Sequence, residues 1–95
     1  MPGFKVVVLE HGYATVEPER RVIEAAGGEF VDAGRLSREE ALRAAGDADA
    51  LLVRWMRITP ELIQRFRRCK IIVRYGIGYD NVDVAAATAA GIMVG

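Results

Sequence analysis

The chain has 95 residues, of which 52% are hydrophobic and 27% are charged, and this suits one compact domain, spanning residues 1–95, rather than two. Its 13 basic and 13 acidic side chains cancel, and no segment concentrates positive charge among aromatic residues, which argues against nucleic acid as a partner. Because no apolar run is long enough to span a bilayer and no signal-peptide pattern opens the chain, we expect a cytoplasmic protein without a membrane partner.

A first strand and a first helix are predicted near the N-terminus. Residues 4–9 form a short β-branched run without alternation, as in a strand covered on both faces. A helix is expected to begin at Pro18 and to end at the glycine pair of residues 27–28. Val22, Ile23 and Ala26 are expected on the face of this helix that packs against the sheet.

The same alternation continues through the middle of the chain. Residues 29–33 read as a second strand. Ser37 and Glu40 have the spacing of a capping box, which predicts a helix that ends near Gly46. Residues 49–54 are then expected to form the third strand.

A third helix is predicted over residues 58–69, with Thr59 as its cap and Pro60 in its first turn. Cations near its C-terminal end are interpreted as the complement of the helix's negative end rather than as a phosphate site. These cations are Arg65, Arg67, Arg68 and Lys70. Cys69 is the only cysteine, so an internal disulfide is excluded, and its apolar neighbours indicate a packed thiol.

The last third of the chain completes an α/β pattern. Residues 70–75 are predicted as a strand, a helix should run from Asp83 to Gly91, and residues 92–94 form a fifth strand. This alternation predicts a flavodoxin-like three-layer sandwich, with a five-stranded parallel sheet in the order 2-1-3-4-5. The usual final helix is missing because the sequence stops at Gly95, so one face of the sheet should be incompletely covered.

The stretch VRYGIGYDNVD, residues 73–83, lies where ligands bind in such sheets, beyond the carboxyl ends of the strands. It lacks the third glycine and the later acidic residue of a dinucleotide fingerprint, so it is not an NAD loop. Gly76 and Gly78 allow a sharp turn with unshielded amides, which permits an anion site beside Arg74. The alternative is a plain strand-to-helix turn in which the glycines only satisfy geometry.

Two other functions that occur on this topology are excluded by particular loops. The first loop, EHGYATVE, lacks the glycine- and hydroxyl-rich phosphate cradle that a flavin mononucleotide would need. The third strand ends in Arg54, where a phosphoacceptor receiver domain would need an aspartate. Neither a flavodoxin nor a working receiver is therefore expected.

The segment RYGIGYDNVD, followed by AAATAAGIMV, closely resembles the amino-terminal domain of the D-isomer-specific 2-hydroxyacid dehydrogenases. This group contains the phosphoglycerate dehydrogenases and the C-terminal-binding-protein corepressors. The resemblance extends over residues 49–95 and, less specifically, over residues 16–33. It implies a flavodoxin-like domain that binds substrate, while a separate Rossmann domain binds NAD and carries most of the chemistry.

The resemblance also implies a site for the substrate carboxylate. The backbone of Gly76, Ile77 and Gly78 would hold the carboxylate, with Arg74 beside it. Arg54 matches an arginine that follows the third strand and lines the same cleft in the phosphoglycerate enzymes. Its guanidinium would suit a carboxylate or a phosphate group.

Four other residues of the same sheet edge are candidates for shaping the cleft. His11, Tyr13 and Trp55 would shape specificity, or else they are a surface histidine and rim aromatics, and His11 is not taken as catalytic. Tyr75 stands where the family usually has a small residue, so it would narrow the cleft or stack on a neighbour.

The chain departs from the family in what it lacks. It has no glycine-rich NAD loop and none of the arginine, carboxylate and histidine set that the family uses for hydride transfer. We therefore expect no catalytic residue, no metal and no cofactor in this chain, whereas the parent enzyme would use NAD. The chain is interpreted as the substrate-binding fragment of a larger two-domain dehydrogenase, inactive alone, with weak affinity for small 2-oxo or 2-hydroxy acids.

An alternative interpretation is a structural module without ligand binding. An uncovered face of a parallel sheet would expose more apolar surface than soluble monomers tolerate, so we expect a homodimer through that face. In the family, the carboxy-terminal chain returns to complete the first domain, which would supply the missing helix. A corepressor-like protein-binding role stays open, although the sequence shows no recognition groove.

Overall fold

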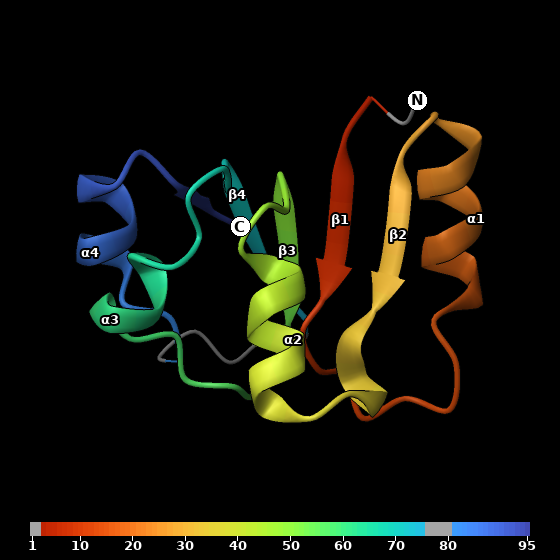
Figure 1. The fold of residues 1–95 in the computed structure, drawn as a ribbon, viewed down its shortest axis with the longest axis horizontal. Helices are drawn as coiled ribbons and strands as arrows, with labels where there is room; N and C mark the ends of the chain where they lie inside the picture. Colours follow the sequence, from red (N-terminus) through yellow and green to blue (C-terminus); the bar gives the residue numbers. More distant parts are fainter. Residues whose placement is uncertain (1–2, 76–80) are drawn as a thin grey trace.

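The computed structural model describes residues 3–75 and 81–95, and it consists of short strands that alternate with short helices (Figure 1). In chain order the elements are β1 (Lys5–Val8), α1 (Glu17–Ala25), β2 (Glu29–Asp32), the 3-10 helix η1 (Ala33–Arg35), α2 (Arg38–Ala45), β3 (Ala50–Val53), α3 (Pro60–Ile63), β4 (Ile71–Arg74), α4 (Val84–Ala89) and β5 (Met93–Val94).

The strands form one parallel sheet in the order β2-β1-β3-β4-β5, which confirms the predicted flavodoxin-like topology. Val7 in β1 pairs with Val31 of β2 on one side and with Leu51 of β3 on the other. Val53 of β3 pairs with Arg74 of β4. The carboxyl ends of these strands therefore share one edge of the sheet, as the sequence predicts.

Side-chain caps start three of the helices where the sequence places them. Ser37 and Glu40 form the reciprocal hydrogen bonds of a capping box at the start of α2. Thr59 caps α3 by accepting the N–H of Leu62, and Asp83 caps α4. These caps satisfy backbone donors that have no partner within the helix, so each helix begins sharply.

Helix α3 is much shorter than the predicted span of residues 58–69, because it ends at Ile63. The next turn tightens, since the N–H of Arg65 bonds to the carbonyl of Leu62 and the N–H of Phe66 bonds to that of Ile63. This turn carries the Phe66 side chain into the core, where it is only 3% exposed. A continuing helix would not bring the chain from there to the start of β4.

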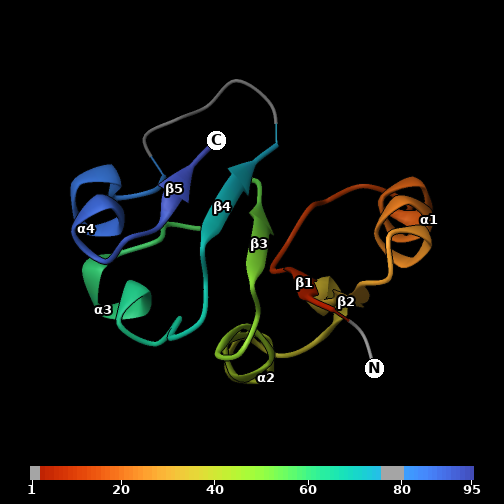
Figure 2. The same ribbon diagram turned by 90° about the horizontal axis from the view of Figure 1, so that it is seen from above.

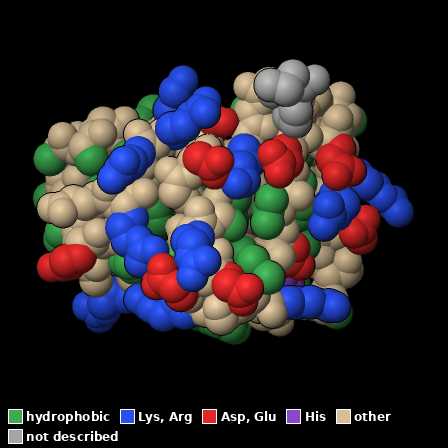
Figure 3. Space-filling view, in the orientation of Figure 1, with side chains coloured by type: hydrophobic (Ala, Val, Ile, Leu, Met, Phe, Trp, Pro, Cys, Tyr) green, Lys and Arg blue, Asp and Glu red, His purple; other side chains and the backbone are tan. Residues whose placement is uncertain are grey.

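The four cations after α3 consequently do not form the last turn of a helix, and that interpretation of them is wrong. Arg65 instead donates to Glu39 of α2 at 2.7 Å, and Arg68 lies 3.7 Å from Asp49. On the face that carries α2, basic and acidic side chains are interspersed and do not gather by sign (Figure 3).

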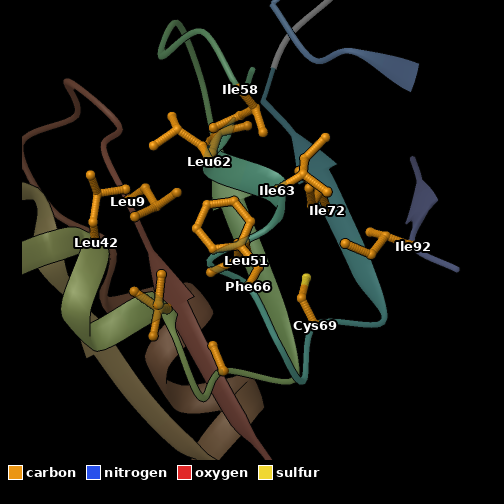
Figure 4. Close-up of a cluster of buried hydrophobic side chains, with 14 of the residues drawn as sticks. Leu9, Leu42, Leu51, Ile58, Leu62, Ile63, Phe66, Cys69, Ile72 and Ile92 are labelled. Atoms are coloured by element: carbon orange, nitrogen blue, oxygen red, sulfur yellow. The ribbon is translucent and has the colours of Figure 1, made fainter. Parts of the chain in front are cut away.

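The main core lies on the face of the sheet that α2, α3 and α4 cover (Figures 2 and 4). Leu51 and Ile72 of the sheet are fully buried there, and Ile58, Leu62 and Phe66 pack on them from the helical side. Cys69 belongs to this cluster, which confirms the packed thiol. Burying this apolar surface is the main driving force of the fold.

The opposite face is covered by α1, and part of it stays open. Its smaller core consists of Val6, Val8, Val16 and Phe30. Beside α1 lies an apolar groove of about 440 Å³, which we call the α1 groove; it is lined by Val6, Pro18, Glu19, Val22, Ile23, Ala50, Leu52 and Val73. Within residues 3–75 and 81–95, α1 is the one helix on this face (Figure 2). The incompletely covered face that the sequence predicts is therefore present.

The prediction for the inner face of α1 was right for Ile23 and wrong for Val22 and Ala26, which are both exposed. Ile23 packs against the smaller core, but Val22 is 69% exposed at the groove. A side chain in this position would be buried only if a further element lay on the sheet beside α1.

None of the described helices is long and apolar enough to cross a membrane.

Candidate functional site

The candidate site is the edge of the sheet at which β1, β3 and β4 end. Three predicted site residues, Gly76, Ile77 and Gly78, lie outside the described residues, so the carboxylate loop stays a prediction. Arg54 and Arg74 are both described, and the pairing of Val53 with Arg74 brings their backbones to the same edge on neighbouring strands.

The guanidinium of Arg54 is held between two aromatic rings. Its Cζ atom lies 4.4 Å from the centroid of Tyr13 and 4.1 Å from that of Trp55. One terminal nitrogen, Nη1, donates to the backbone carbonyl of His11 at 3.0 Å. Two cation–π contacts, together with this hydrogen bond, restrict the movement of the guanidinium. Tyr13 and Trp55, the aromatic residues predicted at the rim, therefore contact the guanidinium of Arg54.

Gly12 lets the first loop approach Trp55 this closely. Its φ is +71°, a conformation that glycine adopts without strain, and a Cβ atom on it would lie 2.7 Å from Cζ3 of Trp55. Both the backbone angle and the contact disfavour a larger residue at this position. The loop after β1 and the loop after β3 are thus fitted to each other.

His11 uses both ring nitrogens within this first loop. Nδ1 accepts the backbone N–H of Tyr13 at 2.9 Å, and Nε2 lies 3.2 Å from Oδ1 of Asp32. Because Nδ1 acts as an acceptor, the geometry assigns the ring proton to Nε2, which donates to Asp32. The imidazole is therefore engaged in shaping the loop.

Tyr75 joins the site to the first helix. Its ring meets that of Tyr13 edge-on, with 5.1 Å between the centroids, so Tyr75 contacts this neighbour but does not stack on it. Its hydroxyl donates to Glu19 of α1 at 2.6 Å. Burial, together with this bond to Glu19, raises the pKa of the Tyr75 hydroxyl well above its usual range. Tyr75 also packs against the smaller core, beside the α1 groove.

Arg74 is bonded to the residue that follows β5. Its backbone N–H and its Nε both donate to the carbonyl of Gly95, at 3.1 and 3.4 Å. Arg54 is tied to the loop after β1, whereas Arg74 is tied to the end of β5. The two predicted arginines therefore share the edge but are bonded to different neighbouring segments.

Two residues of the site were missed by the sequence reasoning. One carboxylate oxygen of Glu10, Oε1, accepts the backbone N–H groups of Arg54, Trp55 and Met56, at 2.6, 2.6 and 2.8 Å. The side-chain amide of Asn81 donates to the carbonyl of Met56 at 3.1 Å. For Glu10, the available signal was its place just beyond the end of β1, where polar side chains reach unpaired backbone groups.

A cleft of about 680 Å³ extends from this site over the end of β2. It is lined by residues 10–17 together with Arg20, Asp32, Gly34 and Arg35. Its charges are mixed, so it is not a single-sign anion pocket.

Within residues 3–75 and 81–95, no three His, Cys, Asp or Glu side chains lie close enough together to hold a metal ion.

Comparison with known proteins agrees with this arrangement. Residues 6–95 match the catalytic-domain model of the D-isomer specific 2-hydroxyacid dehydrogenases. The chain belongs to this family. The match includes all five predicted site residues, so the resemblance on which they were chosen is confirmed, whereas their contacts with substrate stay a prediction.

Curated members of the dehydrogenase family show how much of a whole enzyme the chain represents. It is 41% identical over 75 residues to the D-3-phosphoglycerate dehydrogenase of Methanocaldococcus jannaschii, covering 78% of this chain and 14% of that protein. The human D-3-phosphoglycerate dehydrogenase is 34% identical over 76 residues, covering 79% of this chain and 14% of its own length. The chain thus spans a small part of these relatives.

A solved family member has the same fold. The NAD⁺-bound 3-phosphoglycerate dehydrogenase of Entamoeba histolytica superposes with a TM-score of 0.83 at 34% identity. The superposition covers 96% of this chain and 32% of that one. The described elements therefore correspond to about a third of a dehydrogenase subunit.

Proposed function

We propose that this chain is the substrate-binding part of an NAD-dependent D-2-hydroxyacid dehydrogenase and holds the carboxylate of a small 2-oxo or 2-hydroxy acid. The observation that carries the proposal is the Arg54 guanidinium, fixed between Tyr13 and Trp55 at the edge where β4 leads into the glycine loop. A guanidinium can offer two parallel N–H groups to a carboxylate. Ordering this side chain in advance lowers the entropy cost of binding.

The chemical step would be supplied by other parts of the parent enzyme. Hydride transfer needs a positioned nicotinamide and an acid or base within hydrogen-bonding reach. In the parent enzyme NADH would supply the hydride for reduction of a 2-oxo acid, or NAD⁺ would accept it from a 2-hydroxy acid, and the residues of this chain would bind and orient that acid. His11 is not assigned the acid–base role, because both its nitrogens are engaged within the loop. We propose that the chain alone does not oxidise NADH.

Two matched arginine variants test the assignment of Arg54. Arg54→Gln should weaken the binding of pyruvate roughly tenfold, as expected for the loss of one charge-assisted contact. Arg43→Gln removes an exposed arginine of α2 that lies 4.0 Å from Glu39, and it should leave binding unchanged. Equal affinities for pyruvate in both variants would overturn the proposal.

A second role is favoured by the α1 groove. We propose that two copies of the chain associate through it, each covering the open sheet face of the other. The groove is lined by apolar side chains, and the one carboxylate there, Glu19, is bonded to Tyr75. Val22, exposed at the groove on α1, is available to enter the groove of a second copy, which gives the self-complementary contact of a twofold dimer.

The oligomeric state tests this second role. Val22→Asp should convert a dimer into a monomer in analytical ultracentrifugation, because it places a charge in the apolar contact. Val84→Asp changes an exposed valine of α4, which is 48% exposed and lies away from the groove, and it should leave the dimer intact. A wild-type chain that stays monomeric at high concentration would refute the dimer.

A further inference from the structure

We propose that Glu10 is a positioning residue that fixes the backbone of Arg54 and thereby the direction of its guanidinium. The inference rests on the proposed function, because it gives Glu10 a part in binding the 2-oxo acid through Arg54. Glu10 follows β1, two residues beyond Val8. Its Oε1 atom collects three consecutive N–H groups from the loop after β3, those of Arg54, Trp55 and Met56.

Consecutive amides that point at one place form a concave site for an anion. Here the protein fills that site with its own carboxylate, at donor–acceptor distances of 2.6 to 2.8 Å. Hydrogen bonds to an ionised acceptor are roughly twice as strong as those between neutral groups. The loop is consequently fixed at the residue that carries the guanidinium.

The contact between the two loops is reciprocal. The side chain of Glu10 holds the backbone of the loop after β3, while the side chain of Arg54 donates to the backbone carbonyl of His11 in the loop after β1. Asn81 holds the other side of the same loop through the carbonyl of Met56. Of these contacts, the one from Glu10 acts directly on the N–H of Arg54.

The variant Glu10→Gln changes this contact with little change in size. It replaces a charged acceptor with a neutral amide oxygen, and the three backbone donors are held less firmly. Arg54 should then sample more directions, and pyruvate should bind roughly threefold to tenfold more weakly. Trp55 is the only tryptophan and stacks on Arg54, so its fluorescence reports the position of the guanidinium independently of any ligand.

A double-mutant cycle separates positioning from general stabilisation. Pyruvate dissociation constants are measured for the wild type, Glu10→Gln, Arg54→Gln and the double variant, each well below its unfolding temperature. If Glu10 acts through Arg54, its substitution weakens binding in the wild type and has no further effect in Arg54→Gln. As a matched control, Asp49→Asn alters a carboxylate that accepts the N–H of Lys5 at 2.8 Å at the opposite end of the sheet, and it should leave pyruvate binding unchanged.

Two results would overturn the inference. The first is an equal loss of affinity for pyruvate on Glu10→Gln in the wild type and in Arg54→Gln. The second is an unchanged affinity together with a lower unfolding temperature, which would mean that Glu10 stabilises the fold without positioning Arg54. If the wild type and Arg54→Gln bind pyruvate equally, the proposed function fails, and the fluorescence decides the role of Glu10. A change in Trp55 emission and acrylamide quenching on Glu10→Gln that is absent when Arg54 is already Gln then supports positioning. A change of equal size in both backgrounds, which would come from the bond of Glu10 to the N–H of Trp55 itself, contradicts it, as does unchanged emission.

Discussion

The guanidinium of Arg54 lies 4.1 Å from the ring centroid of Trp55, its neighbour in the chain, although the tryptophan is 65% exposed. An aromatic ring that lies over a guanidinium forms a cation–π contact even when much of the ring is exposed to solvent. Here its ring forms one wall for the cation, and Tyr13 forms the other. Trp55 therefore has a contact within the protein although it is exposed.

The fit between Gly12 and Trp55 predicts an unequal cost for two glycine substitutions. Gly27 also has a positive φ, +88°, but a Cβ on it would meet nothing within 4 Å, so Gly27→Ala should cost only the conformational strain, about 1–2 kcal/mol. Gly12→Ala carries the same strain and in addition displaces the exposed Trp55 ring from Arg54, for up to about 1 kcal/mol more. Urea unfolding of both variants gives the difference. Equal losses of stability would show that Trp55 does not press on the loop.

Tyr75 should make the stability of the protein sensitive to alkaline pH. The pKa of its hydroxyl is raised in the folded state above its ordinary value of 10.0, chiefly by burial. Below that value the tyrosine is protonated in both states and contributes no pH dependence. Above it the unfolded chain loses the proton first, so the free energy of unfolding falls as pH rises.

Tyr75→Phe removes this titration. Because other groups also titrate at alkaline pH, the informative quantity is the difference between wild type and variant in urea unfolding at pH 8 and at pH 11. That difference should shift in favour of the variant at the higher pH. If this difference is the same at both pH values, the folded protein does not raise the pKa of Tyr75.

Cys69 should react slowly with thiol reagents. Burial raises the pKa of its thiol from 9.0 to about 11, and its Sγ lies 3.3 Å from the carbonyl of Ile71. The raised pKa alone lowers the thiolate fraction at neutral pH roughly hundredfold. Iodoacetamide labelling of the native chain should therefore be at least that much slower than labelling in urea. Comparable rates would mean that the core around Cys69 opens readily.

Phe66 should be a core residue even though it lies beyond the end of α3. It is 3% exposed, so Phe66→Ala removes a packed ring and should cost about 3–5 kcal/mol. Leu36→Ala, at a position that is 42% exposed, should change stability by less than about 0.5 kcal/mol. Thermal unfolding of the two variants checks both values. A small effect at Phe66 would contradict the buried turn that ends α3.

The sequence predicted the order of the sheet because the strands are short β-branched runs and the caps at Ser37, Thr59 and Asp83 mark the helix starts. It did not predict the end of α3, since helical spacing continues beyond Ile63 and only tertiary packing draws Phe66 inward. Periodicity identifies a face of a helix, but it does not show which neighbour will cover that face, and for this reason Val22 was misplaced.

The candidate site was predictable only in part for a related reason. Arg54 and Arg74 were found from the family pattern and from their places at strand ends. The contact of Glu10 with the amides of the loop after β3 joins residues 44 to 46 positions apart, so it depends on the register between β1 and β3. No local pattern in the sequence records such a contact.

The most direct test of the account is an amide NMR titration of the chain with pyruvate and, separately, with NADH. We expect pyruvate to shift the signals of Arg54, Trp55 and Arg74, and NADH to shift none, because the chain holds the carboxylate of the acid and leaves the cofactor to the rest of the enzyme. Shifts that leave the Arg54 and Arg74 signals unchanged, or a response to NADH, would contradict the assignment of this edge of the sheet as the substrate site.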